Sequence, residues 1–193
     1  MVYGEENGLI KVSCALAISE VSFLVINNNN ILEYKVDSGW QWTSKWPRLQ
    51  TTRTFTPGCS KVKDKVVIAG GFYPGNTYLY PNFDGPTSKP LQSTEVLDLA
   101  TRKIEYAGNM NTARHSFHLV TIITDNVQKI FALGGFDGSY TFDSVEEFDP
   151  ESFTWRRVKT TIATTRSYYG AMTLSKKAIC PDGYGGDGNQ IFS

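Results

Sequence analysis

The chain has 193 residues, enough for one domain with a sizeable core but few for two. Its 19 Lys and Arg balance 19 Asp and Glu, which argues against nucleic acid or an anionic membrane as the main partner, because phosphate binding needs a basic surplus. No apolar run reaches the ~18 residues of a membrane span, and the acidic start is unlike a signal peptide. We therefore expect a soluble chain, with a cytoplasmic location preferred and an extracellular one left open.

Aromatic residues and glycine dominate the pattern along the chain. The sequence holds 11 Phe, 10 Tyr, 4 Trp and 17 Gly. Aromatic and β-branched residues interrupted by glycine are typical of many short strands rather than helices. The sequence therefore predicts an all-β fold.

A repeat becomes visible when the chain is aligned with itself. A strand-like run with a Gly-Gly doublet occurs twice, as KVVIAGGF at 65–72 and KIFALGGF at 129–136. A degenerate copy, SFLVINNN at 22–29, places Asn27-Asn28 where the glycines stand, and Asn tolerates positive φ best after Gly. Each copy continues through a second apolar strand to an arginine, giving a period of roughly 50 residues.

These motifs resemble the kelch repeat superfamily, in which each repeat is one blade of a β-propeller. The resemblance rests on Gly70-Gly71, on Gly134-Gly135, on the strand Val145–Asp149 and on Trp155. Trp42 stands at the tryptophan position of the first copy, whereas Ile104 replaces it in the second. The expected fold is an all-β kelch-type propeller segment of about three four-stranded antiparallel blades plus one extra strand.

The predicted blades follow one another along the chain. In the best copy we expect strands over Phe117 to Thr124, Lys129 to Gly134, Ser144 to Asp149 and Thr154 to Lys159, with Trp155 covering the interface to the next blade. The predicted propeller segment is 1–180 and a Gly-rich flexible tail is 181–193. The blades cover about 11–50, 54–110 and 115–161, followed by the first strand of a further blade at 167–179.

Three blades and one strand cannot close a ring, since propellers typically have four to eight blades. The sequence therefore predicts a partial propeller that needs further blades or a second chain. A fragment of a longer propeller is the preferred interpretation.

The residues give no support to catalysis or to a metal site. Cys14, Cys59 and Cys180 lie far apart in sequence and are expected to be buried or idle thiols rather than a disulfide framework or a zinc site. His115 and His118 would point to opposite faces of a strand, and His115 is expected on a surface loop. We therefore predict no catalytic residues, no metal and no cofactor.

The kelch resemblance implies a non-catalytic protein-interaction module that binds its partner through inter-blade loops on one face. Three arginines recur just before the first strand of each blade, namely Arg53, Arg114 and Arg166. In such modules these arginines often contact acidic peptide groups, and a guanidinium suits a carboxylate. The alternative role is structural, in which the arginines hold backbone carbonyls along the channel.

A long insertion at 72–92 separates the second and third strands of the middle copy. Long loops in compact domains are often functional, and its aromatic residues are typical contact anchors. Candidate partner-binding residues there are Tyr73, Tyr78, Tyr80 and Phe83. The equivalent short loop of the next copy offers Ser139 and Tyr140.

Two functional alternatives stay open at this stage. A substrate adaptor of a ubiquitin ligase would also carry a BTB domain, and none is visible in this sequence. The other alternative is a fragment of an extracellular, carbohydrate-binding or carbohydrate-modifying kelch protein, which the Gly-rich stretch after Cys180 supports.

Overall fold

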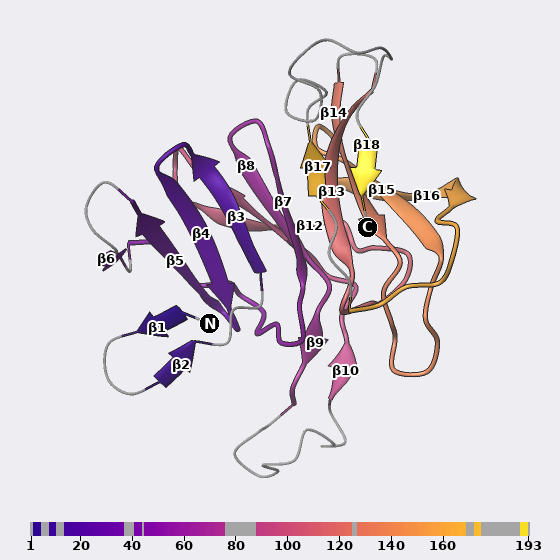
Figure 1. The fold of residues 1–193 in the computed structure, drawn as a ribbon, viewed down its shortest axis with the longest axis horizontal. Helices are drawn as coiled ribbons and strands as arrows, with labels where there is room; N and C mark the ends of the chain where they lie inside the picture. The colour runs from indigo at the N-terminus through magenta and orange to yellow at the C-terminus, as the bar shows by residue number, and fades with distance from the viewer. Residues whose placement is uncertain are drawn as a thin grey trace.

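The computed structural model describes residues 2–4, 8–10, 14–36, 41–43, 45–75, 88–124, 127–168, 172–174 and 190–192. These residues form three four-stranded antiparallel sheets, which we call blades A, B and C (Figure 1). Blade A consists of β3 (Cys14–Ser19), β4 (Ser22–Asn27), β5 (Asn30–Lys35) and β6 (Gln41–Thr43). Blade B consists of β7 (Gly58–Val62), β8 (Lys65–Ala69), β11 (Thr94–Asp98) and β12 (Ile104–Ala107). Blade C consists of β13 (His118–Thr124), β14 (Val127–Leu133), β15 (Ser144–Asp149) and β16 (Thr154–Thr161).

The blades stand side by side with their first strands innermost. Strands β6 and β16 lie at the outer left and right, whereas β3, β7 and β13 lie between them (Figure 1). Strand β7 contacts both β3 and β13. Strand β17 (Met172–Leu174) contacts β13 in turn and pairs with β18 (Gln190–Phe192). The all-β arrangement of successive antiparallel blades confirms the predicted fold class.

Three short strand pairs make up the remaining strands of the described residues. Strands β1 (Val2–Gly4) and β2 (Gly8–Ile10) form a hairpin before blade A. Strands β9 (Phe72–Tyr73) and β10 (Lys89–Pro90) form the base of the predicted insertion. The third pair, β17 with β18, places a strand within the last residues of the predicted flexible tail. No helix long and apolar enough to cross a membrane occurs in the described part of the chain.

Glycine doublets end the second strand of blades B and C because the backbone there needs positive φ. Gly70 and Gly134 have φ of 62° and 58°. A Cβ on Gly134 would lie 2.6 Å from the carbonyl oxygen of Arg166, so the next linker passes too close for any side chain. In blade A the predicted substitute, Asn28, has φ of 57°, which confirms its glycine-like role.

Blade B is apolar on both faces because each face packs against another blade. On β8, Val66 and Ile68 belong to the cluster shared with blade A, whereas Val67 and Ala69 belong to the cluster shared with blade C. This alternation follows from the two-residue period of a strand. The position of Trp155 differs from the prediction, since it packs against the preceding blade rather than the next one.

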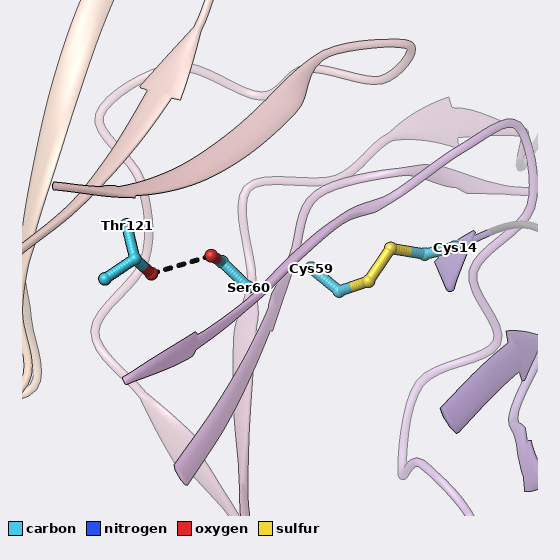
Figure 2. Close-up of a disulfide and its surroundings, with 4 residues drawn as sticks. All are labelled: Cys14, Cys59, Ser60 and Thr121. Atoms are coloured by element: carbon cyan, nitrogen blue, oxygen red, sulfur yellow. Dashed lines mark hydrogen bonds between the residues drawn. A yellow bond between two sulfur atoms is a disulfide. The ribbon is translucent and has the colours of Figure 1, made fainter. Parts of the chain in front are cut away.

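A disulfide between Cys14 and Cys59 joins the innermost strands of blades A and B (Figure 2). The prediction of idle thiols is therefore wrong for these two residues, whose Cα atoms lie 6.2 Å apart. The next residue, Ser60, points the other way and its hydroxyl lies 2.7 Å from that of Thr121 on β13. Strand β7 thus holds one neighbour covalently and the other by a hydrogen bond. Cys180 lies outside the described residues.

Candidate functional site

The linker into blade B carries a buried arginine. Nη1 of Arg53 donates to the carbonyl oxygens of Gly70 and Ser93 at 2.9 and 2.8 Å. Its Nη2 lies 2.9 Å from Oε1 of Glu95, and both side chains are 0% exposed. The same carboxylate accepts two backbone amides of the linker just before Arg53. Burial lowers the pKa of the Arg53 guanidinium from its usual value, and the charge of Glu95 opposes that shift.

The linker into blade C repeats this arrangement. Nη1 of Arg114 donates to the carbonyl oxygens of Gly134 and Ser144, and its Nη2 lies 2.7 Å from Oε1 of Glu146. Both side chains of this pair are also 0% exposed. Arg53 and Arg114 therefore both donate to backbone carbonyl oxygens of the blade that follows them. This is the structural role that was the alternative to partner binding. Direct contact of either guanidinium with a partner stays a prediction and would require it to leave its carboxylate.

Arg166 differs from the two earlier arginines. Its side chain is half-buried, and its Nε donates to the hydroxyl of Thr164. Its main chain keeps the repeat, because its carbonyl oxygen accepts the amide of Gly135 at 2.7 Å. The corresponding bond in the preceding repeat joins Gly71 to the carbonyl oxygen of Arg114. The linkers are therefore fixed to the glycine doublets at one end of the blades.

Two residues after each arginine, the backbone adopts the left-handed conformation at a non-glycine residue. Phe55, Ser116 and Tyr168 have φ of 48°, 54° and 57°. Tyr168 donates its amide to the carbonyl oxygen of Ser116, and Ser116 donates its own amide to that of Thr56. Such backbone is costly for residues with a side chain and often occurs at functional sites. Hydrogen bonds thus connect the three linkers across neighbouring blades.

Aromatic side chains surround His115, some from these linkers and others from the residues that directly follow the glycine doublets. The imidazole centroid lies 5.4 Å from those of Phe72 and Phe136, both nearly perpendicular to it. Phe55 and Tyr168 lie farther out, each at 6.1 Å. His115 is only 5% exposed, so its predicted place on a surface loop is wrong. No local signal predicts this burial, because three of the four rings, Phe55, Phe72 and Tyr168, come from other repeats.

We call this cluster and its neighbour Tyr140 the aromatic face. Its outer members are solvent-accessible, since Phe55, Tyr140 and Tyr168 are 40%, 71% and 69% exposed. Tyr140 belongs to a short loop ordered by Asp137, whose carboxylate accepts the amides of Ser139 and Tyr140. The aromatic face therefore combines a rigid base with exposed rings, the usual composition of contact anchors.

The remaining predicted residues lie beside this face or outside the described residues. Ser139 is exposed in the loop of Tyr140, and Tyr73 is half-buried on β9. Tyr78, Tyr80 and Phe83 lie outside the described residues. Partner contacts of Ser139, Tyr140 and Tyr73 stay predictions, and the sequence analysis did not single out Phe55 and Tyr168, which lie in the same cluster. An aromatic residue two positions after Arg53 and Arg166 was a signal available in the sequence, although Ser116 occupies that position after Arg114.

The described residues contain no group of three or more His, Cys, Asp and Glu side chains able to hold a metal ion. Besides its contacts with aromatic rings, His115 has its imidazole Nδ1 2.8 Å from the hydroxyl of Ser116. Asp137 is the charged group that acts on it electrostatically. The arrangement offers aromatic packing and a hydrogen bond between His115 and Ser116.

Comparisons with known proteins agree with this β-propeller architecture. The Kelch motif family matches residues 128–161, which hold β14 to β16 of blade C. The kelch repeat and BTB domain-containing protein F47D12.7 of Caenorhabditis elegans is 27% identical over 131 residues, which are 67% of this chain and 20% of that protein. The kelch repeat-containing protein kel-10 of the same organism is 28% identical over the same shares. Residues 128–161 thus carry a kelch motif, and the chain is similar to kelch repeat proteins over two thirds of its length.

A solved structure supports the fold independently of sequence. The structure of YjhT aligns with a TM-score of 0.63 at 10% identity and covers 83% of this chain and 54% of that chain. At this identity the likeness concerns the fold alone. The chain spans about a fifth of the length of the curated relatives that it matches. The comparisons give no support to the carbohydrate alternative.

Proposed function

We propose that the chain is a non-catalytic protein-interaction module that binds its partner through the aromatic face. The observation that carries this proposal is the exposure of Phe55, Tyr140 and Tyr168 on loops that the blades hold rigidly. Exposed aromatic rings bury much apolar area with few rotatable bonds, so they lose little entropy on binding. The named relatives are kelch repeat proteins, and kelch repeats generally bind proteins, which supports the same function.

The partner's contact with this face is mainly apolar in our proposal. Arg53 and Arg114 already neutralise Glu95 and Glu146 within the fold, so an acidic peptide would find little free cationic surface there. Arg166 is the half-buried arginine beside the face and the best candidate for an acidic group. The loops with Tyr73 and Ser139 border the face and extend the proposed contact.

A role as the recognition part of a ubiquitin ligase adaptor is a finer proposal. One relative is named for a BTB domain as well as for kelch repeats, and this chain matches a fifth of that protein. The same coverage leaves room for further blades, which the partial propeller predicted from the sequence would need to close a ring. Both points concern a longer protein and would be tested on it.

The proposed function is tested by comparing capture of cellular proteins by the wild-type chain and by a Phe55→Ser/Tyr168→Ser variant. We expect partners captured by the wild type to be lost or weakened at least tenfold with the variant. The matched control is Ile123→Ser, because Ile123 is 54% exposed at the opposite end of blade C. Partners retained by the aromatic-face variant as well as by the control would contradict the proposal.

A further inference from the structure

His115 is a titratable group enclosed by the aromatic face. Phe55 and Tyr168 from the two neighbouring linkers, and Phe72 and Phe136 next to the two glycine doublets, contact its ring, and it is 5% exposed. A neutral imidazole can pack its faces and edges against such rings as another aromatic residue would. A charged imidazolium in the same place would have to be removed from water, which is costly.

The groups around His115 supply little compensation for a charge. Burial lowers the pKa of its imidazole, and the carboxylate of Asp137 opposes that shift. The buried charges on the neighbouring linkers, Arg53 and Arg114, already face their own carboxylates. Phe55, Phe72, Phe136 and Tyr168 present rings, and Ser116 presents a hydroxyl 2.8 Å from Nδ1. The closed cluster therefore favours the neutral ring.

The segments expected to move when His115 is protonated are the linkers whose backbone has positive φ at a non-glycine residue. Phe55, Ser116 and Tyr168 hold positive φ in three consecutive linkers. The hydrogen bonds of the Ser116 and Tyr168 amides join these linkers to one another. Release of the central ring removes packing that offsets the backbone cost, so the three linkers are expected to respond together.

We propose that His115 acts as a pH-sensitive pivot of the aromatic face, which closes around the neutral ring and opens when the ring is protonated. The face would then bind its partner at neutral pH and release it in a mildly acidic environment. This regulation rests on the proposed function, whereas the opening itself can be measured without a partner.

The sign and size of the effect follow from linkage. An open form exposes His115 and gives it an ordinary pKa near 6.5, whereas the closed form binds the proton less readily. Acid therefore favours the open form, and stability of the closed form is lost as pH falls below about 6.5. Between about pH 7.5 and 5.5 the ratio of open to closed form rises up to about tenfold.

Amide hydrogen exchange tests the opening directly. After correction for the intrinsic exchange rate, protection of the Ser116 and Tyr168 amides is expected to fall up to about tenfold between about pH 7.5 and 5.5. The Val67 amide in the central strand of blade B should keep its protection over this range. The His115→Phe variant should lose the pH response, and the matched control His118→Gln should retain it.

A second measurement covers the case in which His115→Phe does not fold. Histidine NMR of the wild-type chain should give His115 a pKa below its usual 6.5, as burial requires. Titration at or above that value, or protection at Ser116 and Tyr168 that stays constant across this pH range, would overturn the proposal. Partner capture at neutral pH would remain a separate result, so loss of the pH response leaves the proposed function standing.

Discussion

The two joints of blade B use different chemistry to achieve the same geometry. The A–B joint carries the Cys14–Cys59 disulfide and a cluster of aliphatic side chains with no aromatic residue among its fully buried members. The B–C joint has the Ser60–Thr121 hydrogen bond and a cluster whose buried members include the rings of Phe117, Phe148 and Trp155. The Nε1 of Trp155 donates to the hydroxyl of Thr94 across this joint at 2.9 Å.

The repeat therefore sets where neighbouring blades make contact but does not set which interactions hold them together. The backbone of β7 alternates its side chains, so Cys59 faces blade A and Ser60 faces blade C. The buried Arg–Glu pairs, by contrast, are the same in blades B and C. The described residues of blade A have no glutamate at this position, since Glu95 pairs with Ile68 on β8 whereas Leu32 pairs with the corresponding Val25 on β4.

The largest effect is expected at the feature that blades B and C share. Arg53→Met and Arg114→Met should each lower the free energy of unfolding by about 3–5 kcal/mol, because each leaves a buried carboxylate without its cation. Urea unfolding measures both losses. Replacing the paired glutamate by Gln as well should recover part of each, and unequal losses would show that the two pairs are not equivalent.

The next largest loss of stability is expected at the A–B joint, which depends on a disulfide and is therefore sensitive to reductant. Reduction of Cys14–Cys59, or a Cys14→Ser/Cys59→Ser variant, should lower the free energy of unfolding by about 2–4 kcal/mol, because the unfolded chain regains the freedom of a loop 45 residues long. Thermal melts with and without reductant measure this loss. The variant itself should be insensitive to reductant, and a wild type that also ignores reductant would contradict the assignment.

A smaller effect is expected at the B–C joint. Ser60→Ala removes the hydroxyl that contacts Thr121 and should cost about 1 kcal/mol. Thr121 keeps its bond to the carbonyl oxygen of Lys61, so no buried group is left without a partner. Urea unfolding should show this loss equally in oxidised and reduced protein. A loss that appears only after reduction would mean that the two joints are coupled.

The smallest effect concerns an acid-sensitive turn in blade B. Hydrogen bonds from Thr101 and Lys65 lower the pKa of Asp98 to about 2. Because its folded pKa is below the usual value near 4, Asp98 stabilises the fold above that pH and loses this contribution as pH falls toward 2. Asp98→Asn should therefore flatten the acid limb of a plot of melting temperature against pH. An unchanged acid limb would contradict this role.

Much of the fold could be predicted from the sequence because its signals are local. The Gly-Gly doublets report positive φ, and Asn28 replaces glycine for the same reason. The predicted strand at Ser144–Asp149 agrees with β15 to the residue. The repeated arginines were also evident in the sequence, but their burial could not be predicted. It depends on Glu95 and Glu146, which lie on the third strand of the blade that follows each arginine.

The blades are encoded locally, because the alternation of a strand and the glycine of a turn act over a few residues. Which side chains meet between blades depends instead on how the blades pack. Cys14 and Cys59 pair because β3 and β7 lie side by side, and His115 is buried because rings from its own repeat and from the two adjacent repeats surround it. Such contacts join residues tens of positions apart, and their partners are set by how neighbouring blades pack rather than by any local pattern.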